Sequence, residues 1–101
     1  MQTDKILSDL AKPFVLSGLY KDEKVALTDI ALNYVIRKID EYDKTMQSLT
    51  KKYGPDFDQF TKDIKNKASF EQEDDWMDWK SAIEMRQSWA NLYKMIMKNA
   101  G

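Results

Sequence analysis

Apolar residues recur in the middle of the chain with a spacing that a single long helix can use. Seven of them follow at intervals of 3, 4, 3, 4, 3 and 4 residues: Leu32, Val35, Ile39, Tyr42, Met46, Leu49 and Tyr53. Side chains three and four residues apart share one face of an α-helix, so these seven form a continuous apolar seam over three heptads. The positions between them are mostly polar, and the pattern therefore predicts a long amphipathic helix over residues 22–53.

The residues at both ends of this segment support the same boundaries. Asp22 and Glu23 precede the seam, where acids suit the positive end of the helix dipole, and Lys51 and Lys52 close it. Gly54 and Pro55 follow as a stop signal. Such a helix is about 48 Å long at 1.5 Å per residue, whereas a compact domain of this size has a radius of gyration of about 13 Å. The seam therefore needs a partner, either another helix of this chain or a second copy.

Three further segments complete a predicted single helical domain over residues 1–101. Residues 1–20 predict a short helix to Ala11, ended by Pro13, and then an extended segment that could form a short strand. Residues 55–64 predict a short helix with one apolar stripe. Residues 69–98 predict a last helix, because Ser69 and Gln72 have capping-box spacing. The predicted fold is all-α, with the long helix folding back through Gly54 and Pro55 onto the last helix.

Acidic and aromatic residues concentrate where the last helix begins. Five acids fall within eight residues: Glu71, Glu73, Asp74, Asp75 and Asp78. They suit either a solvated helix start or a docking surface for a basic partner; a metal site is the least favoured of the three, because the run lacks the spacing of a calcium loop. Trp76 and Trp79 among them, and Trp89 beyond, are either core residues or exposed anchors.

Composition excludes most catalytic chemistry. The chain has no Cys and no His, so thiolate chemistry, a zinc site built on His or Cys and a Ser-His-Asp triad are all excluded. No glycine-rich phosphate loop occurs either. We therefore expect a binding protein rather than an enzyme, with no cofactor and no metal.

The charge balance and hydropathy bound the partners. The formal net charge is −1, from 16 Lys and Arg against 17 Asp and Glu, so no broad basic field for nucleic acid exists. Local DNA contact stays open and would require four lysines on one face: Lys5, Lys12, Lys21 and Lys24. No apolar run approaches the ~20 residues that a membrane helix needs. The N-terminal residues lack the apolar stretch of a signal peptide, and we expect a cytoplasmic protein.

Residues 18–89, about 70% of the chain, contain three elements in a distinctive order. They read Gly18-Leu19-Tyr20-Lys21-Asp22-Glu23, then Lys52-Tyr53-Gly54-Pro55-Asp56-Phe57-Asp58-Gln59-Phe60, and finally Glu73-Asp74-Asp75-Trp76-Met77-Asp78-Trp79-Lys80-Ser81-Ala82-Ile83-Glu84. Together they resemble small prokaryotic proteins, often archaeal, that are similar to antitoxins of toxin–antitoxin modules. The resemblance implies a protein that binds and neutralises a toxin, and that often acts as a dimer to repress its own operon.

The leading hypothesis is a non-catalytic protein-binding module of the antitoxin kind. Its predicted partner-binding residues are Glu73, Asp74, Asp75, Trp76, Asp78 and Trp79, which would dock a basic toxin. A homodimer through the seam of the long helix, Leu32 to Tyr53, is expected alongside core packing of the same seam. The alternatives are a dimeric DNA-binding transcriptional regulator and a structural or interaction protein.

Overall fold

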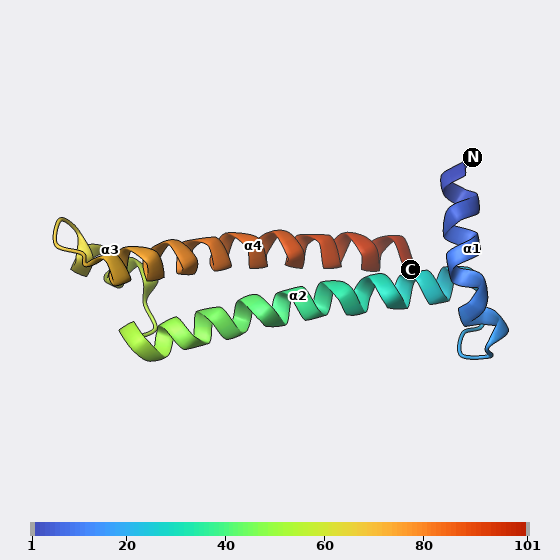
Figure 1. The fold of residues 1–101 in the computed structure, drawn as a ribbon, viewed down its shortest axis with the longest axis horizontal. Coiled ribbons are helices and arrows are strands. Elements are labelled where there is room, and N and C mark those ends of the chain that lie inside the picture. The colour runs from blue at the N-terminus through green and yellow to red at the C-terminus, as the bar shows by residue number, and fades with distance from the viewer. Residues whose placement is uncertain (1, 101) are drawn as a thin grey trace.

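The chain forms an elongated hairpin of two long helices with a shorter helix at each end (Figure 1). The computed structural model describes residues 2–100, and these contain four helices and no strand. The helices are α1 (Gln2–Leu16), α2 (Glu23–Tyr53), α3 (Phe57–Ile64) and α4 (Phe70–Ala100). The molecule measures 59 × 26 × 24 Å with a radius of gyration of 19.5 Å. The prediction of an all-α hairpin is confirmed.

The two ends of the hairpin differ in how they are covered. At one end α3 packs beside the last turns of α2 and the first turns of α4, and we call this the α3 end (residues 46–83). At the other end α1 crosses the hairpin next to the start of α2, with the C-terminal turns of α4 nearby (Figure 1). We call this the α1 end (residues 2–36 and 89–100).

Local signals in the sequence set most of the helix boundaries. The side chain of Asp22 accepts a hydrogen bond from the Val25 amide at 2.9 Å and caps α2. Gly54 ends α2 with a φ of 97°, a conformation that glycine adopts without strain, and its amide donates to the Thr50 carbonyl at 2.8 Å. The predicted stop at residue 53 is therefore confirmed.

The predicted capping box before α4 is also confirmed. The hydroxyl of Ser69 accepts from the Gln72 amide at 3.2 Å, and the Gln72 side chain accepts from the Ser69 amide at 3.0 Å. The two bonds satisfy backbone donors on either side of the helix start, and they fix where the acidic stretch of the sequence begins.

A hydrophobic cluster lies at the α3 end and contains one buried residue of each of three helices. Leu49 of α2, Phe60 of α3 and Trp79 of α4 form it, and the side chain of Trp79 is only 2% exposed. The Phe60 ring stacks on Tyr53 with 4.1 Å between centroids and lies 5.7 Å from the Trp79 ring. Trp79 is therefore a core residue, one of the two interpretations that the sequence left open.

The apolar seam of α2 finds its partner within the chain. Val35 and Leu49 are buried, and the other five seam residues are half-buried: Leu32, Ile39, Tyr42, Met46 and Tyr53. The helix packed along this face is α4. The intrachain interpretation of the seam is thus confirmed, and its use in a dimer stays a prediction.

The prediction for residues 1–20 was wrong in one respect. No strand or extended segment forms at residues 14–20, because α1 continues through Pro13 to Leu16. Proline costs a helix one backbone hydrogen bond, but tertiary contacts support this turn: Ala11 is fully buried and Phe14 packs edge-on against Tyr20 at 6.1 Å. The helix ends instead at Leu16, and Gly18 in the turn that follows has a φ of 81°.

Truncating Trp79 should remove most of the stability of the hairpin. We expect Trp79→Ala to lower the free energy of unfolding by about 3–5 kcal/mol, because it opens a cavity where three helices meet. Urea unfolding followed by circular dichroism measures the loss. Phe70→Ala is the control, since that ring is 89% exposed, and a surface truncation should cost less than about 0.5 kcal/mol. Equal losses for the two variants would contradict the assigned core.

Candidate partner-binding site

Three of the acids at the start of α4 are exposed and unpaired. Glu73, Asp74 and Asp78 all face solvent, and among residues 2–100 none of them forms an ion pair. They lie on the first three turns of α4, directly beyond the capping box. We call these three carboxylates the acidic surface.

The other two acids at this end are occupied by α2. The ammonium group of Lys52 donates to Asp75 at 2.8 Å and also bonds Glu71. The hydroxyl of Tyr53 donates to the same Asp75 carboxylate at 2.5 Å. Asp75 and Glu71 therefore tie the end of α2 to the start of α4 and are less available to a partner.

The hydrogen bonds in this tie shift the pKa values of its members. The Lys52 ammonium, and then the Tyr53 hydroxyl, lower the pKa of Asp75 below its ordinary value of 3.8. The hydrogen bond to Asp75 in turn raises the pKa of Tyr53, and the bonds to Asp75 and Glu71 raise the pKa of Lys52. At neutral pH the Asp75 carboxylate and the Lys52 ammonium are therefore charged while the Tyr53 hydroxyl keeps its proton, so the tie acts as a structural link.

Trp76 joins α4 to α3. Its indole nitrogen donates to the Thr61 hydroxyl at 2.8 Å, and its ring stacks on Phe57 with 5.9 Å between centroids. Lys80 places its ammonium group over the indole, 5.5 Å from the ring centroid. The Trp76 side chain is half-buried, so it is both a packing residue and a surface residue.

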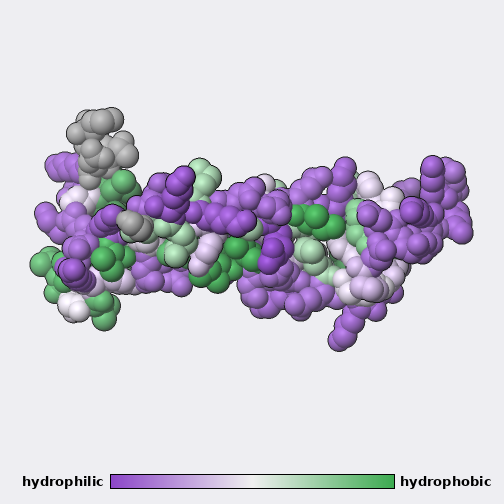
Figure 2. Space-filling model, turned by 180° about the vertical axis from the view of Figure 1, so that it is seen from behind, coloured by the Kyte–Doolittle hydropathy of each residue, from purple (hydrophilic) through white to green (hydrophobic). Residues whose placement is uncertain are grey.

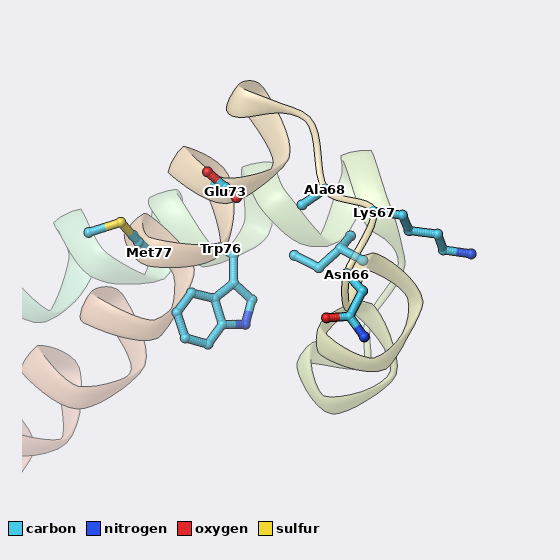
Figure 3. Close-up of a pocket in the computed structure, with 7 residues that line it drawn as sticks. Asn66, Lys67, Ala68, Glu73, Trp76 and Met77 are labelled. Atoms are coloured by element: carbon cyan, nitrogen blue, oxygen red, sulfur yellow. The ribbon is translucent and has the colours of Figure 1, made fainter.

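A hollow of about 620 Å³ opens beside the acidic surface, between the start of α4 and the loop that follows α3. Figure 3 shows the indole of Trp76 between α4 and this loop, with Lys67 directed away. The residues that line the hollow are Ile64, Asn66, Lys67, Ala68, Glu73, Trp76 and Met77. Met77 is 62% exposed. The hollow thus adds apolar surface beside the carboxylates.

The structure places the six predicted partner-binding residues in different situations. Glu73, Asp74 and Asp78 are exposed, Asp75 and Trp76 hold the α3 end together, and Trp79 is in the core. The loop over residues 65–68, which lines the hollow, was not among the predicted partner-binding residues. Only the fold brings that loop beside Trp76, and no local pattern in the sequence indicates it.

The four lysines considered for DNA contact all lie at the α1 end. Lys5, Lys12, Lys21 and Lys24 are exposed, on α1 or around the first turn of α2. Asp9 and Asp22 are exposed among them, which weakens the local positive field. Contact with nucleic acid through these lysines stays a prediction.

Residues 5–100, whose side chains the structure describes, contain no cluster of three or more acidic side chains arranged to hold a metal ion. Within the same range, no helix combines the length and the apolar character that crossing a membrane requires.

Comparison of the chain with protein-family models, with curated proteins and with solved structures gave no match. The function proposed below therefore rests on the sequence and on the geometry of the α3 end.

Asp75→Asn should weaken the tie between α2 and α4 in a pH-dependent way. The lowered pKa of Asp75 means that its contribution to stability is complete above about pH 5 and is lost as the pH falls through that pKa. We expect the variant to lose about 1 kcal/mol of unfolding free energy at pH 7, as for a partly exposed, charge-assisted hydrogen bond. Urea unfolding is measured from pH 2 to pH 7, about two units on each side of the ordinary carboxyl pKa range. The unfolding free energies of the two proteins should become equal in acid.

Asp74→Asn is the matched control, because it removes a carboxylate of the acidic surface that has no ion pair. This variant should keep the stability of the parent protein within about 0.5 kcal/mol. A loss equal to that of Asp75→Asn, or a gap between parent and Asp75→Asn that persists in acid, would rule out the structural role of Asp75.

Proposed function

We propose that the chain is a non-catalytic protein-binding module of the antitoxin kind, which docks a basic partner protein at the α3 end. The contact surface would be the acidic surface together with the neighbouring hollow and Met77. The observation that carries the proposal is a set of three exposed carboxylates, without ion pairs among the described residues, next to a hollow lined by both apolar and polar side chains. The resemblance to antitoxins of two-gene modules points the same way.

The helix dipole accounts for only part of this charge. Acids in the first turn of a helix are stabilised by its positive end, but the effect falls off beyond that turn. Asp78 lies past the second turn of α4, four residues after Asp74, and like charges at this spacing repel each other. Among the described residues Asp78 therefore has no ion pair to balance its charge, whereas a basic partner would supply one.

The apolar part of the surface supports a binding role as well. Protein interfaces combine an apolar centre with a polar rim. Here Met77 and Trp76 would form the apolar centre, and the acids would form the polar rim. Methionine adapts its shape to a partner. Acidic charge around such a centre mainly raises the rate of association with a basic protein, which suits rapid neutralisation of a toxin.

The acidic surface sits on a rigid support. Asp75 is held by Lys52 and Tyr53, and Trp76 is held by Thr61 and Phe57. A preformed surface loses little conformational freedom on binding. A partner would therefore find the carboxylates already in place, without any reordering of the hairpin.

Removing the charge of the acidic surface should abolish partner capture while leaving the fold intact. The test uses the triple variant Glu73→Gln, Asp74→Asn and Asp78→Asn, co-expressed with the product of the neighbouring gene. We expect the parent chain to co-purify with that product and to restore growth when the product is toxic. The triple variant should bind at least about tenfold more weakly, mainly through a slower association rate, since rim charges act on the on-rate.

A second triple variant provides the control, because it removes three exposed carboxylates that lie outside the acidic surface: Asp40→Asn, Glu41→Gln and Glu84→Gln. It changes the net charge equally and should retain binding. The antitoxin proposal fails if the parent chain neither binds nor rescues growth. It also fails if the two triple variants weaken binding equally, because the location of the charge would then not matter.

A further inference from the structure

Helix α1 has two faces of different character. Its inner face is small and close-packed: Ala11 is fully buried against the hairpin, and the Ser8 hydroxyl donates to the Glu23 carboxylate at 3.0 Å. Its outer face carries large apolar side chains that remain exposed, namely Ile6, Leu7, Leu10 and Phe14, with Ile6 at 58% and Leu10 at 62% exposure. The smaller residues of α1 thus contact its own chain, while the larger ones are left without cover.

Further large apolar side chains are exposed on the neighbouring elements of the same end. They are Leu16 at the end of α1, Leu19 in the turn, Val25 and Ile30 on α2, and Leu92, Met95 and Met97 on α4. Figure 2 shows hydrophobic residues gathered toward this end of the molecule, while the opposite end is mostly hydrophilic. We call these seven residues, with the four on the outer face of α1, the α1-end surface. At the α3 end the large exposed apolar residues are Phe70 and Met77.

The elongated chain as a whole exposes more surface than a compact monomer of the same mass, and part of this surface is available to a second copy. The chain exposes 7799 Å², roughly 1,800 Å² more than the ~6,000 Å² that a compact monomer of this mass exposes. Each subunit of an obligate homodimer buries about 1,000–2,500 Å². The excess for one chain therefore falls within the range that a subunit of a stable dimer buries.

We propose that a second copy of this chain covers the α1-end surface, so that the protein is a homodimer joined through α1 and the ends of the hairpin. A two-fold interface uses the same patch on both subunits, so its charges must be compatible with themselves. The rim of the α1-end surface has both signs, with Asp9 and Asp22 exposed among its lysines. A strongly basic protein, as suits the acidic surface, would meet Lys5 and Lys12 here. The same partner is therefore disfavoured at this end.

The dimer also explains how α1 can be stable. A helix of 15 residues is marginal in water on its own, and this one lacks a backbone hydrogen bond at Pro13. Burial of Ile6, Leu7 and Leu10 in a dimer would supply the stabilisation that contact with α2 alone does not. The fraction of molecules with a folded α1 should then rise with protein concentration, as for any element that association stabilises.

This interface is separate from the acidic surface. The two lie at opposite ends of the hairpin (Figure 1), so that one dimer would present two acidic surfaces and bind two partner molecules. It also differs from the seam of α2, which α4 already covers.

Sedimentation equilibrium of the full chain between about 1 and 200 µM tests the proposal. These concentrations cover roughly two decades and would detect a dimer with a micromolar dissociation constant. We expect the parent chain to have twice the mass of one chain at the upper concentrations. Leu10→Glu and, separately, Ile6→Glu should raise the dimer dissociation constant about tenfold or more, because each places a charge in the centre of an apolar interface. Both side chains are mostly exposed in the single chain, so the hairpin itself should stay folded.

Phe70→Glu is the matched control, because it makes the same kind of change on an 89% exposed side chain at the α3 end. It should leave the dissociation constant unchanged. A monomeric parent chain at all concentrations would overturn the proposal, and so would a dimer that resists both α1 variants, since its contacts would then lie elsewhere. The acidic-surface variants should lose partner binding but still form the dimer. The dimer proposal and the antitoxin proposal are therefore tested independently.

Discussion

The contact between Trp79, Phe60 and Leu49 determines the rest of the structure. Two long helices with one apolar stripe each can slide along or separate from one another, because heptad packing repeats. The short helix α3 prevents this by inserting Phe60 between Leu49 of α2 and Trp79 of α4. The register of α2 against α4 is thereby fixed, and so are the polar links that depend on it. Asp75 meets Lys52 and Tyr53, and Asp43 pairs with Arg86, only in this register.

The same contact explains why the two ends of the hairpin suit different tasks. At the α3 end three helices share a core, so the acidic surface and its hollow stand on a firm support. At the α1 end a single short helix crosses α2 and leaves its larger apolar side chains uncovered. Local stability follows the density of buried contacts. In the functions proposed above, the α3 end would present a preformed surface to a different protein, and the α1 end would gain order when a second copy binds.

Signals confined to a few neighbouring residues were sufficient to predict most of the fold. The seam from Leu32 to Tyr53, the Gly54 stop and the Ser69–Gln72 capping box depend on side chains within a turn or two of each other, and the structure contains all of them. The errors arose where distant residues decide the outcome. Pro13 indicated the end of a helix, but contacts of Ala11 and Phe14 with residues beyond the turn continue it. The occupation of Asp75 by Lys52, and the hollow beside Trp76, likewise depend on the α2–α4 register, which has no local signature.

Hydrogen exchange resolved along the chain tests the central claim, that stability is concentrated at the α3 end and that α1 depends on association. We expect the slowest amide exchange around Leu49 and Trp79, at a rate that does not change with protein concentration. We also expect faster exchange in α1, slowing as the concentration rises and not slowing in Leu10→Glu. Uniform protection along the hairpin, or an α1 whose slow exchange is independent of concentration, would contradict the account.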